Sequence, residues 1–64
     1  MWMVVYIAQS KETAERISAL LRDAGMLVKI RVTNQGAQDQ YGGFEILVPE
    51  SEVDGAHTVI IDAL

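Results

Sequence analysis

Hydrophobic residues at the start of the chain form an unbroken run, and a helical pattern follows. Residues 1–8 (MWMVVYIA) are β-branched, aromatic or otherwise apolar at nearly every position, which predicts a strand buried on more than one side. Ser10 is a favourable helix N-cap, and Gly25 stands where a left-handed turn would end that helix. We therefore predict a helix over residues 11–24, with an apolar stripe of Ala14, Ile17, Leu20, Leu21 and Ala24.

Two further segments in the second half of the chain alternate between apolar and polar residues. Residues 26–33 (MLVKIRVT) alternate after their first positions, which predicts a half-buried strand. Residues 44–48 (FEILV) alternate in the same way and stop at Pro49, which cannot donate a hydrogen bond to a neighbouring strand. Ser51 followed by Asp54 then resembles a helix capping box. We expect a second helix from there to the C-terminus, with an apolar stripe of Val53, Ala56, Ile60 and Ala63.

The order of these elements, βαββα, predicts an α+β fold with a three-stranded antiparallel sheet. The two later strands are consecutive and should form a hairpin, and the helix before them should be a right-handed crossover. The expected sheet order is 1-3-2 with both helices on one face, which is a ferredoxin-like split βαβ unit that lacks its last strand. A chain of 64 residues has room for a single domain, residues 1–64.

The apolar faces of the two hairpin strands also predict their register. The pairs that put apolar residues on the inner face are Val28–Val48, Ile30–Ile46 and Val32–Phe44. This register places Arg31 opposite Glu45 on the open face of the sheet. A shift by one residue would turn the apolar set outward, whereas a shift by two would preserve the faces and stays open as an alternative.

Two segments that cover almost the whole chain resemble a known family. They are VVYIAQSKETAERISALLRDAGMLVKIR and FEILVPESEVDGAHTVI, with a Val-Tyr-x-Ala strand end, a small-Gly-apolar turn and Glu-Ile-Leu-Val-Pro before the last helix. The chain resembles a family of very short prokaryotic proteins of unknown function that are labelled as signal-transducing proteins. The resemblance implies a ferredoxin-type fold, related in shape to nitrogen-regulatory PII proteins. The matching positions are structural, so the resemblance carries no catalytic motif to this chain.

Composition and charge narrow the classes of function. The chain has no cysteine and one histidine, which removes disulfides, thiolate metal sites and imidazole clusters, and we expect no cofactor. Nine acidic and five basic residues give a net charge of -4, and the bases form no stripe. We therefore expect neither a nucleic acid nor a membrane as partner. The lack of cysteine and of a signal peptide favours a cytoplasmic location.

Titratable residues in the second half of the chain give no catalytic pattern. His57 is the one histidine of the chain, but the sequence offers it no nucleophile and no orienting partner, so we expect a boundary or surface histidine and no enzyme. Glu50, Glu52 and Asp54 cluster at the start of the second helix. Acids gather there because the positive end of the helix dipole attracts them, so we interpret the cluster as structural.

The polar segment between the hairpin strands is a weaker candidate for ligand binding. Residues 34–43 form a longer connection than the usual hairpin loop, and long loops often bind ligands. Tyr41, Gly42 and Gly43 are the candidate ligand-binding residues, because glycines free backbone N–H groups for an anion. The segment has no lysine or arginine, so a plain turn is the favoured interpretation and the ligand is unknown.

The first strand is the strongest candidate for an interface. Its alternate faces are both apolar, and only one of them can meet the helices. We expect Met3, Val5 and Ile7 to point inward, because aromatic residues such as Trp2 tolerate a site that is partly wet. The interface residues predicted on the open face are Trp2, Val4, Tyr6 and Leu47. We also expect no charge, proline or bulge in residues 1–8 to protect the outer edge of this strand.

These features predict a non-catalytic regulatory or protein-interaction module that forms a homodimer through its first strand or the open face of its sheet. A different protein is a further possible partner, and the family resemblance implies a role in signal transduction. The alternative is a domain that senses a small metabolite through residues 34–43 or through the subunit interface.

Overall fold

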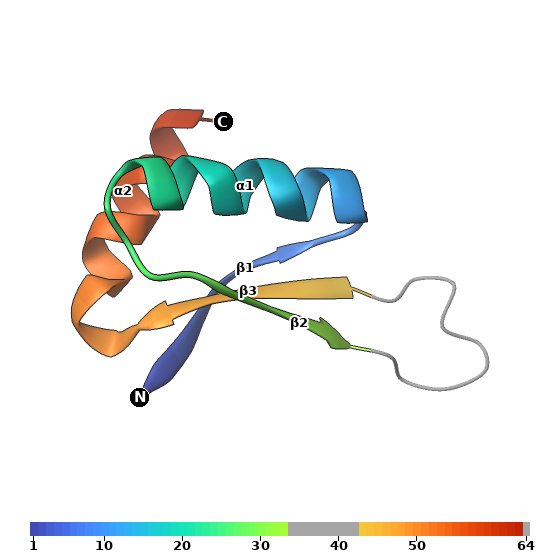
Figure 1. Ribbon diagram of the computed structural model, residues 1–64, viewed down its shortest axis with the longest axis horizontal. Coiled ribbons are helices and arrows are strands. Elements are labelled where there is room, and N and C mark those ends of the chain that lie inside the picture. Colours follow the sequence, from blue (N-terminus) through green and yellow to red (C-terminus); the bar gives the residue numbers. More distant parts are fainter. Residues whose placement is uncertain (34–42, 64) are drawn as a thin grey trace.

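The computed structural model describes residues 1–33 and 43–63, and its elements follow the predicted order. The strands are β1 (Trp2–Ala8), β2 (Lys29–Thr33) and β3 (Gly43–Pro49). The helices are α1 (Lys11–Asp23), a short 3-10 helix η1 (Glu50–Glu52) and α2 (Val53–Ala63). The strands form one antiparallel sheet in the order β1-β3-β2, and both α-helices lie on the same face of it (Figure 1). The predicted α+β architecture is confirmed, and no helix among the described residues covers the other face of the sheet, which we call the open face.

Helix α1 begins and ends at the residues that the sequence indicates. The Ser10 hydroxyl accepts a hydrogen bond from the Thr13 backbone N–H at 3.2 Å, which caps the N-terminus. Gly25 has φ +90°, and its N–H donates to the Arg22 carbonyl at 2.9 Å. The Met26 N–H donates to the Leu21 carbonyl at 3.1 Å, which completes a Schellman motif.

The buried face of α1 differs from the predicted stripe at two positions. Ala14, Ile17 and Leu21 are buried as predicted, but Ala24 is exposed because it is the C-cap residue, beyond the last helical turn. Ser18 is fully buried, which the apolar pattern did not indicate. Its hydroxyl has no hydrogen-bond partner in the part of the chain that the structure describes.

The hairpin of β2 and β3 has the predicted register. Ile30 lies opposite Ile46, Val32 opposite Phe44, and Arg31 opposite Glu45. The ladder starts at Lys29, one residue after the predicted pair of Val28 with Val48. Val32 is 61% exposed although it faces the helix side, because β2 is an edge strand of the sheet that the described residues form.

Strand β1 contains a β-bulge at Val5, and this overturns part of the prediction for the first strand. Val4 pairs with Leu47 and Tyr6 pairs with Ile46. Leu47 and Ile46 are neighbours on β3, so Val5 is an extra residue on β1. An extra residue in a strand shifts the alternation of side chains by one. Val5 and Tyr6 therefore both pack against the core, whereas Ile7, expected inside, is 55% exposed. The expected absence of a bulge and the placing of Tyr6 on the open face are wrong.

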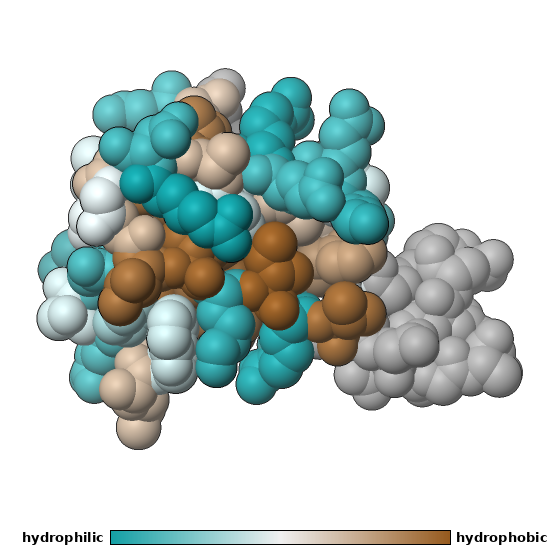
Figure 2. Space-filling view, in the orientation of Figure 1, coloured by the Kyte–Doolittle hydropathy of each residue, from teal (hydrophilic) through white to brown (hydrophobic). Residues whose placement is uncertain are grey.

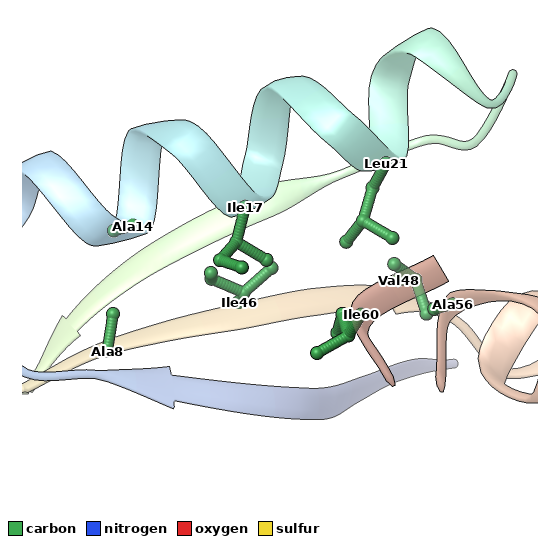
Figure 3. Close-up of a cluster of buried hydrophobic side chains, with 8 residues drawn as sticks. All are labelled: Ala8, Ala14, Ile17, Leu21, Ile46, Val48, Ala56 and Ile60. Carbon is green, nitrogen blue, oxygen red and sulfur yellow. The ribbon is translucent and has the colours of Figure 1, made fainter. Parts of the chain in front are cut away.

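The core between the sheet and the helices is small. Its eight buried residues are Ala8, Ala14, Ile17, Leu21, Ile46, Val48, Ala56 and Ile60. Figure 3 shows the side chains of α1 and α2 pointing toward Ile46 and Val48 on the central strand β3. Three of the eight residues are alanines, so little apolar volume is buried. A single core in a domain of this size rarely supplies more than about 3–5 kcal/mol of stability.

The second helix starts differently from the prediction. The backbone of Pro49 is extended and η1 follows it, so Ser51 lies inside a 3-10 turn and is not the N-cap of α2. Ala56 and Ile60 are buried and Val53 is half-buried, as the stripe predicts, but Ala63 is exposed in the last turn. His57 is exposed, which confirms the predicted surface histidine.

Candidate interaction surface on the first strand

Exposed large hydrophobic residues are concentrated at the start of the chain. Of the eight such residues in the described chain, five lie within residues 1–7: Met1, Trp2, Met3, Val4 and Ile7. The other three are Leu27, Val32 and Ile61. Strand β1 has no charged side chain. We call these five residues the β1 surface, and such a concentration of exposed apolar side chains is typical of an interaction site.

Three side chains of the β1 surface lie on the open face of the sheet. Trp2 is opposite Pro49, Val4 opposite Leu47, and Ile7 opposite Glu45. These residues of β3 alternate with Ile46 and Val48, which point into the core, so their partners on β1 face away from the helices. The structure thus confirms that Trp2 and Val4 lie on the open face. It places Ile7 there as well, whereas Tyr6 faces the core.

Leu47 lies beneath this surface and contributes little exposed area to it. It is on the open face but is only 3% exposed. Its cross-strand neighbours are Val4 on β1 and Lys29 on β2. The Lys29 ammonium lies 4.7 Å from the centre of the Trp2 ring, so these two side chains meet across β3. The apolar stem of Lys29 therefore shields Leu47 from water.

The β2 side of the open face is charged. The Arg31 Nε donates to the Glu45 Oε1 at 2.7 Å, and the Arg31 Nη2 lies 2.6 Å from the same oxygen. This is the cross-strand pair that the register predicts. The open face thus has an apolar part over β1 and a charged part over β2, with Lys29 reaching between them.

The backbone of β1 also presents unpaired groups at its outer edge. The Met1 carbonyl accepts a hydrogen bond from the Glu50 N–H at 2.8 Å, so Met1 directs its backbone groups toward β3. Alternate residues of an antiparallel strand direct both backbone groups to the same side. Met3 therefore also faces β3, and Trp2 and Val4 direct their N–H and C=O groups away from it. In the described chain β1 has no strand on that outer side.

A second apolar strip follows the opposite edge of the sheet. Figure 2 shows a hydrophobic band with hydrophilic side chains above and below it, on the side of the molecule that carries β2. The half-buried or exposed apolar residues of this region are Leu20, Met26, Leu27, Val28, Ile30 and Val32. Most of them are partly covered by the core, and charged side chains alternate with them along β2.

The other predicted site residues give little chemistry. Tyr41 and Gly42 lie outside the described residues, and Gly43 is a buried residue that pairs with Thr33 at the start of β3. The Glu52 carboxylate accepts a hydrogen bond from the Leu27 N–H at 3.2 Å, which ties η1 to the segment before β2. Within residues 1–33 and 43–63 no cavity and no cluster of potential metal ligands is present. None of the helices described there has the length and hydropathy to cross a bilayer.

Sequence patterns missed Ile7 and Lys29 as parts of this surface. Nothing in the uniformly apolar run of residues 1–8 indicates a bulge, so the outward position of Ile7 had no signal. The position of Lys29 did have a signal in the sequence, because the predicted register places Lys29 on the same face as Leu47.

No protein-family model, no curated protein and no solved structure matches the chain. The resemblance to the family of signal-transducing proteins therefore stays a prediction. The case for a function rests on the surface of the chain itself.

Proposed function

We propose that the protein is a small interaction module that acts by binding, without catalysis, and that it self-associates through the β1 surface. The observation that supports this proposal is the concentration of five exposed large hydrophobic residues within residues 1–7. Burying apolar surface stabilises a protein by about 25 cal/mol per Å², so a partner that covers β1 gains free energy.

A second copy of the chain is the occupant that these observations favour. Strand β1 carries no charge, so two copies of net charge -4 can meet there without bringing like charges together. The small core favours association as well, because a dimer buries surface that 64 residues cannot cover alone. Homodimers with two-fold symmetry are the commonest solution. The regulatory role that the family resemblance implies would then be exerted by the dimer.

Sedimentation velocity at micromolar concentrations tests the proposal. We expect the unmodified protein to be a dimer, and we expect Val4→Lys to be a folded monomer, because it puts a charge into the contact. Val32→Lys is the matched control: this residue is β-branched and 61% exposed, but it lies on the edge strand at the other side of the sheet. It should remain a dimer.

Circular dichroism checks that each variant is folded. A monomeric unmodified protein contradicts the proposal, and so does a dimer that Val4→Lys leaves intact. Tyr6 is not a suitable position for this test, since its side chain packs against the core.

A further inference from the structure

The unpaired backbone groups of β1 define how a second copy could bind. We infer that two copies join through their β1 strands as a two-fold, antiparallel ladder centred on Met3. This inference rests on the proposed function, because it specifies the geometry of the same self-association. The ladder would join two three-stranded sheets into one sheet of six strands, in the order β2-β3-β1-β1-β3-β2, which is a common size.

The outward-facing residues of β1 are complementary to themselves. Trp2 and Val4 both direct their N–H and C=O groups to the free edge, and one residue separates them. An antiparallel copy that places its Val4 opposite Trp2 also places its Trp2 opposite Val4. Each such pair exchanges two N–H···O bonds. Met3 then lies on the two-fold axis, opposite Met3 of the second copy.

The bulge at Val5 restricts the ladder to this register. Pairing Val4 with Val4 of the second copy would put Trp2 opposite Tyr6. Tyr6 is paired with Ile46, and its backbone groups point into its own sheet, so that register loses its outer hydrogen bonds. Pairing Trp2 with Trp2 of the second copy would place Val4 beyond the first residue of the other β1 strand, which begins at Trp2. In the register centred on Met3, the outward backbone groups of both Trp2 and Val4 have hydrogen-bond partners.

The exposure of side chains fits the same register. Met3 is 39% exposed although it lies opposite the buried Val48. On the axis it would form a non-hydrogen-bonded pair with its copy, the pair type in which side chains approach most closely. On the open face, Trp2 would lie beside Val4 of the second copy. The ladder thus brings apolar residues of the two copies side by side on both faces of the strand.

Cysteine cross-linking tests the register directly, because the chain has no cysteine of its own. The Cα atoms of a non-hydrogen-bonded pair are about 4.5 Å apart, within the range that a disulfide spans. Under mild oxidation Met3→Cys should therefore give a covalent dimer on a non-reducing gel. Ile7→Cys lies on β1 away from the axis, and Val32→Cys lies on β2, so both should stay monomeric on that gel.

Val4→Pro gives an independent test, because proline removes the outward N–H but keeps an apolar side chain. Edge strands tolerate proline where the missing N–H would face solvent, so this variant should keep its fold. We expect its dimer dissociation constant to rise roughly 30-fold, the equivalent of losing two ordinary hydrogen bonds.

The outcomes separate this inference from the proposed function. A dimer that cross-links through Ile7→Cys and not through Met3→Cys keeps self-association but overturns the ladder, in favour of stacked open faces. The same conclusion follows if folded Val4→Pro dimerises as tightly as the unmodified protein. A monomeric unmodified protein overturns both.

Discussion

The two edges of the sheet are built differently, although they belong to the same three strands. Strand β2 has five residues and carries Lys29 and Arg31. Strand β1 has seven residues and carries no charge. Charged side chains, lysine above all, discourage a sheet edge from pairing with other chains. β2 is therefore the protected edge, and β1 is the edge at which a partner is expected.

The bulge at Val5 shows that β1 is not simply unprotected. A bulge interrupts the row of outward backbone groups and increases the local twist, which limits how long an added strand can pair. On β1 it leaves Trp2 and Val4 as a short, self-complementary segment. On the proposed function, a segment of that kind would favour a closed dimer over an open-ended assembly.

The largest effect is expected from replacing Tyr6, which tests the bulge itself. Tyr6→Lys puts a charge against the core and should lower the free energy of unfolding by roughly 2–4 kcal/mol, most of what a domain of this size has. Ile7→Lys, one residue further on, should change the intrinsic stability of the subunit by less than about 1 kcal/mol. Urea unfolding, with the fraction of dimer measured in parallel, compares the two. A larger loss for Ile7→Lys than for Tyr6→Lys would mean that β1 alternates without a bulge, because Ile7 would then face the core.

Two substitutions at α1, away from both edges of the sheet, change the stability of the subunit without touching either edge strand. Ser18→Ala removes a buried hydroxyl without a partner in the described chain, and should raise the free energy of unfolding by about 1 kcal/mol. Ser10→Ala, on the same helix, removes the N-cap and should lower it by about 1 kcal/mol. Urea midpoints at constant slope measure both changes. A destabilised Ser18→Ala would show that the hydroxyl has a partner.

The smallest effect concerns the contact that links the β2 side to β1. Lys29→Met keeps an apolar stem over Leu47 but removes the cation from the Trp2 ring, and should cost about 0.5–1 kcal/mol. Lys29→Ala should cost more, since it also uncovers Leu47. Trp2 is the single tryptophan of the chain, so its fluorescence reports on the contact during unfolding. Equal stability of the two variants would mean that the stem does not shield Leu47.

Local signals in the sequence determined most of the fold. Ser10 and Gly25 set the ends of α1, because capping and a positive φ depend on residues only a few positions apart. The register of β2 against β3 followed from two alternating strands, since a shift by one residue would expose the apolar face. Trp2 and Val4 were also correctly placed on the open face, so part of the candidate surface could be predicted.

Only the tertiary structure decided which residues of β1 lie on the open face of the sheet. A run of apolar residues has no alternation to select a face, and the ladder with β3 set the choice by skipping Val5. The contact between Trp2 and Lys29 joins the two outer strands of the sheet, β1 and β2, so these residues meet only after folding. The burial of Ser18 likewise depends on packing against other elements. These features could not be derived from local patterns because they arise from contacts between residues far apart in the chain.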